Sequence, residues 1–104
     1  MTFDEFWPRY LRQHSRPATR RVHVLGTTMG VLLLGGAVLN QDWRLAVAAL
    51  VVGYGAAWLS HAFIERNRPE TFSHPVWSLL GDLRMTWLFL TGALDRELDR
   101  LGIR

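Results

Sequence analysis

Two uncharged segments decide the fold class of this chain: VHVLGTTMGVLLLGGAVL (residues 22–39) and LAVAALVVGYGAAWLSHAFI (residues 45–64). They are 18 and 20 residues long, and a helix of about 20 residues, rising about 1.5 Å per residue, crosses the hydrocarbon of a bilayer. A soluble protein of 104 residues would have too little chain left to bury two such helices. The sequence therefore predicts one all-α membrane domain over residues 1–104, with a transmembrane hairpin at its centre.

The short stretch NQDWR (residues 40–44) predicts the tip of this hairpin. The expected spans are residues 20–39 and 45–65, approximately. Gly26 and Gly30 lie on the first span, and the second span carries its own cluster of small residues: Gly53, Gly55, Ala56 and Ala57. Small residues let two membrane helices approach closely, so we expect these faces to be in contact.

Amphipathic helices are expected on both sides of the hairpin. Thr2 and Glu5 have the spacing of a capping box, and aromatic and apolar residues then recur at helical spacing as far as His14. This pattern predicts a helix lying at the membrane interface, ending before residues 15–19. After a loop over residues 66–75, a continuous apolar stripe predicts a last helix from Val76 to about Leu101, which could either span or lie in the interface.

The charged residues indicate an orientation and exclude several classes of function. All twelve basic residues are arginine, the formal net charge is +3, and cysteine is absent. Disulfides, thiolate ligands and cysteine nucleophiles are therefore excluded. The arginines flank the apolar segments and do not line one face, which argues against a nucleic-acid partner. Five precede the first span, two follow the second and one lies at the tip. This asymmetry predicts that the N-terminus and the 66–75 loop lie in the cytoplasm. We expect an integral protein of a bacterial inner membrane.

All four histidines are expected at the cytoplasmic end of the hairpin. His23 lies nineteen residues before Asp42 and His61 nineteen residues after it, so antiparallel helices would hold them at one depth. His14 is nine residues from His23 across a turn, and His74 lies in the loop that leaves the second span. Imidazoles bind iron, zinc and copper, and histidines with a carboxylate and open positions suit non-haem Fe(II). We therefore expect a metal site with these four residues as candidate ligands.

Further candidate residues surround the histidines. Glu65 follows the histidine of the second span by one helical turn and is a candidate catalytic residue. It could be a ligand, an acceptor that orients a histidine, or only the partner of nearby arginines. Arg66, Asn67 and Arg68 are candidates for binding a substrate carboxylate, although arginines here could equally anchor lipid headgroups. Asp82 could reach the site or simply stabilise the N-terminus of its helix.

Two other functions remain open on these residues. Paired histidines at one depth on two spans also describe a bis-histidine haem site. A non-enzymatic membrane adaptor could instead use its histidines and arginines to contact lipid headgroups. The sequence predicts no particular oligomeric state.

Two blocks of the sequence carry a resemblance to a known family: YLRQHSRPATRRVHVLGT (residues 10–27) and HAFIERNRPETFSHPVWSLLGDLRM (residues 61–85). They resemble short membrane proteins long classed as a domain of unknown function, whose fungal relatives are Fe(II)-dependent 2-hydroxy fatty acid dioxygenases. The resemblance implies alpha-oxidation, in which a 2-hydroxy fatty acid and O2 give the fatty acid one carbon shorter. It implies that His14, His23 and His61 bind the iron, while His74 matches the bacterial form of the pattern.

Overall fold

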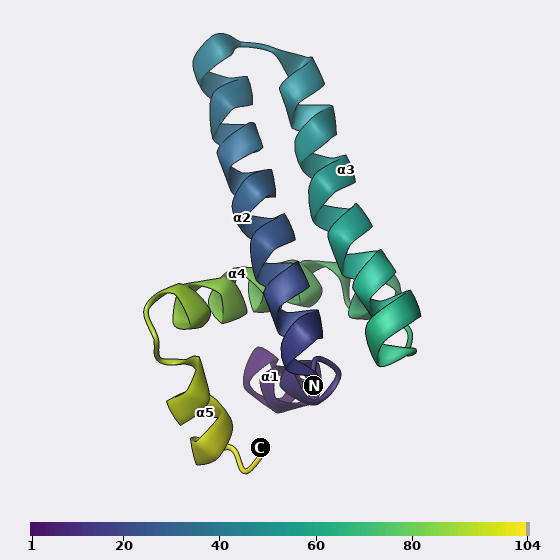
Figure 1. Cartoon of the computed structure of the whole chain (residues 1–104), viewed down its shortest axis with the longest axis vertical. Coiled ribbons are helices and arrows are strands. Elements are labelled where there is room, and N and C mark those ends of the chain that lie inside the picture. The colour runs from purple at the N-terminus through teal and green to yellow at the C-terminus, as the bar shows by residue number, and fades with distance from the viewer. Residues whose placement is uncertain (104) are drawn as a thin grey trace.

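The computed structural model describes residues 1–103, which contain five α-helices, one π-helical turn, one short 3-10 turn and no strand (Figure 1). The α-helices are α1 (Phe3–Arg12), α2 (Pro17–Asn40), α3 (Trp43–Ser60), α4 (Pro75–Leu90) and α5 (Leu94–Arg100). The π turn η1 (His61–Glu65) continues α3, and the 3-10 turn η2 (Glu70–Phe72) lies in the following loop. The predicted all-α class is confirmed.

Helices α2 and α3 form the expected antiparallel hairpin. The tip is closed by Gln41 in the left-handed conformation (φ 50°) and by Asp42, whose side chain accepts a hydrogen bond from the Arg44 amide at 3.0 Å. A Cβ added to Gly26 would overlap the Cβ of Ala56. The close approach of the two helices at small residues, expected from the sequence, is therefore confirmed at Gly26 and Ala56, whereas Gly55 lies away from α2.

Both hairpin helices are long and apolar enough to cross a membrane: Pro17–Asn40, and α3 with its π turn, Trp43–Glu65. Only 22% of the apolar window of each is buried within the chain. A core helix of a soluble protein would be mostly buried, so the apolar outer faces of this hairpin lack a covering within the described residues.

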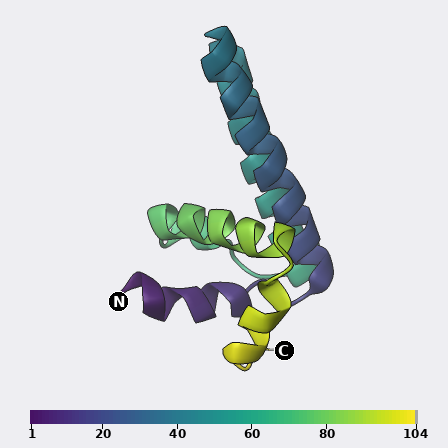
Figure 2. The same cartoon turned by 90° about the vertical axis from the view of Figure 1, so that its left-hand side faces the viewer.

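The remaining helices pack together at the foot of the hairpin. Helices α1 and α4 both extend to the same side of it, one beneath the other (Figure 2). The predicted N-terminal helix is confirmed and begins at its Thr2 cap, but it ends at Arg12, so His14 lies in the turn that follows it. The aromatic stripe of α1 is the centre of a core to which α2, α4 and α5 also contribute: Phe6, Trp7, Tyr10, Leu11, Val24, Met85, Leu94 and Leu98.

The prediction of one continuous helix from Val76 to about Leu101 is wrong. Helix α4 ends at Leu90, and Gly92 adopts a left-handed conformation (φ 78°). The Ala93 amide then bonds to the Leu88 carbonyl at 2.8 Å, which is the 6→1 bond that ends helices at a glycine. This break turns α5 back onto α1. Within the described residues α4 is not among the candidate spans, and it crosses the foot of the hairpin instead.

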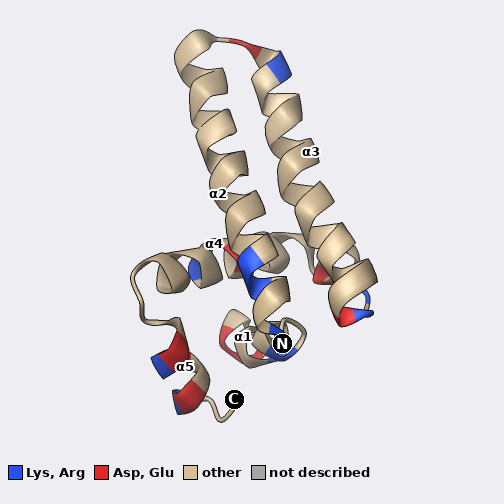
Figure 3. Ribbon diagram, in the orientation of Figure 1, with Lys and Arg blue, Asp and Glu red and all other residues tan. Residues whose placement is uncertain are grey.

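Charged residues gather at the two ends of the hairpin and leave its shafts free (Figure 3). The tip carries Asp42 and Arg44, while the foot holds most of the charges, including those of α1, the 66–74 loop and α5. The polar chemistry of the chain is therefore concentrated where α1 and α4 meet α2 and α3.

Candidate metal centre

Three of the four histidines meet in a buried cluster at the foot of the hairpin. One ring nitrogen from each of His14, His23 and His61 lies within 4.8 Å of the others. The ring centroids are 4.3, 4.6 and 5.0 Å apart, and the rings are nearly perpendicular to one another. Each side chain is at most 3% exposed. The cluster therefore joins the α1–α2 turn, α2 and the end of α3, as the hairpin register predicts.

The Nδ1 atoms of His14 and His23 each face an oxygen acceptor. Nδ1 of His14 lies 2.6 Å from the Tyr10 carbonyl, and Nδ1 of His23 lies 3.2 Å from Oδ1 of Asp82. A carbonyl and a carboxylate can only accept, so each ring carries its proton on Nδ1. Burial, and then the neighbouring His23, lower the pKa of His14 well below its usual value, which keeps that ring neutral.

Nδ1 of His61 is held in the same way, by Oδ1 of Asn67. The amide group of Asn67 is oriented by its own Nδ2, which donates to the Gln13 carbonyl at 3.1 Å. The π turn makes this contact possible. It ends with Arg66 in the left-handed conformation, and the backbone N–H of Asn67 then donates a hydrogen bond to the His61 carbonyl at 3.0 Å. Single π turns are rare and recur at functional sites. Asn67, predicted to bind substrate, therefore has a contact that positions a histidine.

These hydrogen bonds leave the three Nε2 atoms with bare lone pairs. Nε2 of His14 and Nε2 of His61 are 3.1 Å apart, and Nε2 of His23 is buried without a hydrogen-bond partner. Two acceptors at this distance repel unless a cation or a proton lies between them. Two nitrogens at about 2.1 Å from one ion are about 3 Å apart when they subtend a right angle. His14 and His61 thus have the donor chemistry and spacing of two ligands to one metal ion, and His23 brings a third imidazole to the same cluster.

Tyr10 and Asp82 support this cluster from α1 and α4. The Tyr10 hydroxyl donates to the same Asp82 oxygen that faces His23. Burial, and then the adjacent Asp82 carboxylate, raise the pKa of Tyr10 well above its usual value, so the hydroxyl keeps its proton. Its ring packs on Gly81, where an added Cβ would lie 2.9 Å from ring carbons. The sequence suggested Asp82 as one option and gave Tyr10 only as part of the apolar stripe.

Glu65 lies outside the cluster. Its carboxylate accepts hydrogen bonds from the Arg16 amide at 2.7 Å and the Ser15 hydroxyl at 3.2 Å. It therefore ties the end of the π turn to the α1–α2 turn. The carboxylate that contacts a histidine of the cluster is Asp82, which belongs to α4.

His74 also stands apart from the other histidines. Its Nδ1 contacts the buried Glu70 carboxylate at 3.0 Å, and its ring stacks on Trp77. Glu70 in turn pairs with Arg9 of α1 at 3.1 Å. These contacts fasten the 66–74 loop to α1, and a metal-binding role for His74 stays a prediction.

The two candidate substrate-binding arginines lie in the exposed loop after the π turn. Arg66 occupies the left-handed position, and the guanidinium of Arg68 lies 5.4 Å from the centre of the Phe72 ring. Arg84 belongs to the packing of α4, with its guanidinium 4.5 Å from the Trp7 ring centre. Neither of these features joins Arg66 or Arg68 to the histidine cluster.

Fold and site together define a small all-α protein in which an apolar hairpin and two crossing helices enclose a three-histidine centre. The chain belongs to the family described as 2-hydroxy-palmitic acid dioxygenase Mpo1-like, whose model matches residues 1–94. The match includes every residue of the cluster and its hydrogen-bond partners. No curated protein and no solved structure gave a significant match.

Proposed function

We propose that this protein is an Fe(II)-dependent dioxygenase that shortens 2-hydroxy fatty acids by one carbon. The observation that carries the proposal is the pair of Nε2 atoms of His14 and His61, 3.1 Å apart in a buried cluster that also holds His23, whose Nε2 has no hydrogen-bond partner. Such an arrangement is stable when a metal ion satisfies all three lone pairs. The family description supplies the reaction class and the type of substrate.

Iron is the metal that best joins this donor set to that reaction class. Neutral imidazoles suit zinc, copper, nickel and iron alike. Zinc has no redox chemistry, whereas a dioxygenase needs a metal that exchanges electrons with O2. When bound, ferrous iron would supply that redox capacity and a Lewis-acid centre for the carboxylate and hydroxyl of the substrate.

The overall reaction balances without any further reductant. The bond between C1 and C2 of the 2-hydroxy acid breaks, C2 becomes the new carboxyl carbon, and C1 leaves as CO2. The substrate loses four electrons, O2 accepts them, and water carries the remaining atoms. The chain's own residues keep the three Nδ1 protons in place through the Tyr10 carbonyl, Asp82 and Asn67, so that the three Nε2 lone pairs stay available to a metal ion.

The hairpin would hold this centre at the surface of a membrane. Its charge-free shafts suit hydrocarbon and its charged foot suits the headgroup region. The arginine asymmetry of the sequence supports an orientation with that foot on the cytoplasmic side. An acyl substrate could then reach the site while its chain stays in the bilayer.

The two rival functions have weaker support in the geometry. Axial nitrogens on opposite faces of a haem are about 4 Å apart, and the macrocycle needs room between them, whereas the Nε2 atoms of His14 and His61 are 3.1 Å apart among closely packed rings. An adaptor that contacts headgroups through its histidines would expose them, but all three are buried.

Metal analysis of the protein purified without a histidine tag tests the proposal. We expect about one iron per chain after anaerobic reconstitution, and turnover of 2-hydroxyhexadecanoic acid to pentadecanoic acid with consumption of O2. His61→Ala should lose iron and turnover together while the helical circular dichroism remains. His74→Ala tests the fourth candidate ligand: loss of iron would make His74 part of the metal site, and retained iron would limit the site to the three clustered histidines. A folded His61→Ala protein with wild-type turnover would refute the proposal.

A further inference from the structure

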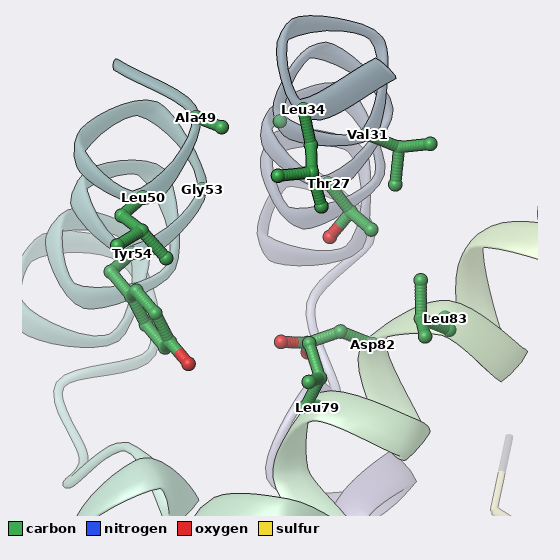
Figure 4. Close-up of a pocket in the computed structure, with 11 residues that line it drawn as sticks. Thr27, Val31, Leu34, Ala49, Leu50, Gly53, Tyr54, Leu79, Asp82 and Leu83 are labelled. Atoms are coloured by element: carbon green, nitrogen blue, oxygen red, sulfur yellow. The ribbon is translucent and has the colours of Figure 1, made fainter. Parts of the chain in front are cut away.

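A groove on the hairpin begins beside the residue that supports His23. It has a volume of about 270 Å3 and lies between α2 and α3 above α4 (Figure 4). Eleven residues line it: Thr27, Gly30, Val31, Leu34, Ala49, Leu50, Gly53, Tyr54, Leu79, Asp82 and Leu83. The α2 residues of the groove recur at helical spacing from Thr27 to Leu34. These seven helical steps of about 1.5 Å each give the groove a length of about 10 Å along α2. The groove therefore follows the axis of the hairpin.

The polar groups of the groove are all at its lower end. Because α2 and α3 are antiparallel, Thr27 and Tyr54 lie at one level near the foot, where Asp82 forms part of the floor (Figure 4). Toward the tip the lining is aliphatic, as at Leu34 and Ala49. A ligand with one polar end and one hydrocarbon end matches this distribution in a single orientation.

We propose that this groove binds the hydrocarbon chain of a membrane-resident acyl amphiphile, with its polar head at the Asp82 end and its methyl end toward the hairpin tip. Asp82 joins the groove to the metal centre, because its Oδ1 faces His23 while its side chain lines the groove floor. The inference rests on the proposed function, and it adds the subsite that positions the substrate.

The shape of the groove contributes more to substrate positioning than the hydrophobic free energy of binding does. An alkyl chain that moves from lipid into an apolar groove exchanges one hydrocarbon environment for another, so little transfer free energy is available. What the groove provides is a fixed direction of approach to the centre, which is worth more to a reaction than additional uniform binding. Filling the groove should therefore redirect the chain without disturbing the metal site.

Gly53 and Gly55 offer a matched pair of variants for this test. A Cβ at either position meets no atom within 4 Å, but only Gly53 lines the groove. Leucine is the better helix former, so Gly53→Leu and Gly55→Leu should both fold and bind iron as the wild type does. The probe is 2-hydroxyhexadecanoic acid with a diazirine near its methyl end, photolysed in nanodiscs with metal-free and iron-loaded protein, and mapped by mass spectrometry.

In the wild type we expect labels at groove residues such as Val31, Leu34 and Leu50. Gly53→Leu should reduce this labelling by about tenfold, as expected when an apolar site is overpacked, while Gly55→Leu leaves it unchanged within about twofold. Labels spread evenly onto the outward residues Leu32 and Val51, or equal labelling in the two variants, would overturn the groove assignment. Groove-specific labelling without any turnover would refute the proposed function but support the groove as an acyl-chain site. Turnover with scattered labels would support the proposed function but refute the groove assignment.

Discussion

Replacing Asp82 tests which carboxylate supports the centre. Its Oδ1 faces two donors, Nδ1 of His23 at 3.2 Å and the Tyr10 hydroxyl, whose residues are 3% and 1% exposed. A hydrogen bond to a charged group contributes about 1.5–3 kcal/mol, which corresponds to about 10–150-fold in an equilibrium constant. Asp82→Ala should therefore weaken iron binding by about 100-fold, within the range measured for residues that orient metal ligands. Asp82→Asn, which keeps one acceptor oxygen but no charge, should cost about tenfold.

The assay is anaerobic competition for Fe(II) against a chromophoric chelator, with thermal unfolding followed in parallel by circular dichroism. Glu65→Gln is the control, because the Glu65 carboxylate bonds to Ser15 and Arg16 outside the cluster. It should lower the melting temperature and leave iron affinity within about threefold, the usual spread of such contributions. If Glu65→Gln lost iron and Asp82→Ala did not, the carboxylate expected from the sequence would be the functional one, and the reasoning from hydrogen bonds would be refuted.

Two further predictions concern the loop and the orientation. Asn67→Leu removes the acceptor of His61 and should weaken iron binding by about 10–100-fold; an unchanged iron affinity with a raised KM would instead favour the substrate-binding role expected from the sequence. Reporter fusions at Met1 and Pro69 should be active in the cytoplasm and a fusion at Asp42 outside it, and a cytoplasmic Asp42 would contradict the proposed orientation.

The sequence by itself determined the hairpin and the meeting of three of the four histidines that it predicted to converge. Uncharged segments of 18 and 20 residues around a short polar turn allow few structures other than two antiparallel helices. Their symmetry about Asp42 then holds His23 and His61 at one level, and the short connection after α1 brings His14 to them. Periodicity and chain length are local properties, so they can be followed residue by residue.

The sequence also contains the residue that ends α4, but the continuous apolar stripe predicted a helix that runs past it. Gly92 is a helix-ending residue, yet the apolar stripe continues past it to Leu94 and Leu98. The stripe reflects burial on both sides of the break, because α5 folds back onto the core of α1. Periodicity alone does not distinguish one helix from two that share a core.

Only the tertiary structure decided which groups support each histidine. Asp82 reaches His23 from a helix 59 residues away in sequence, and Asn67 reaches His61 because the second span ends in a π turn. Glu65 would share a face with His61 in a regular α-helix, but the wider turn directs it to Arg16. Hydrogen bonds between elements require donor and acceptor positions that are correct within tenths of an ångström, and these positions depend on how the helices cross and end. The spacing of residues along one helix carries no information about the helix that packs against it.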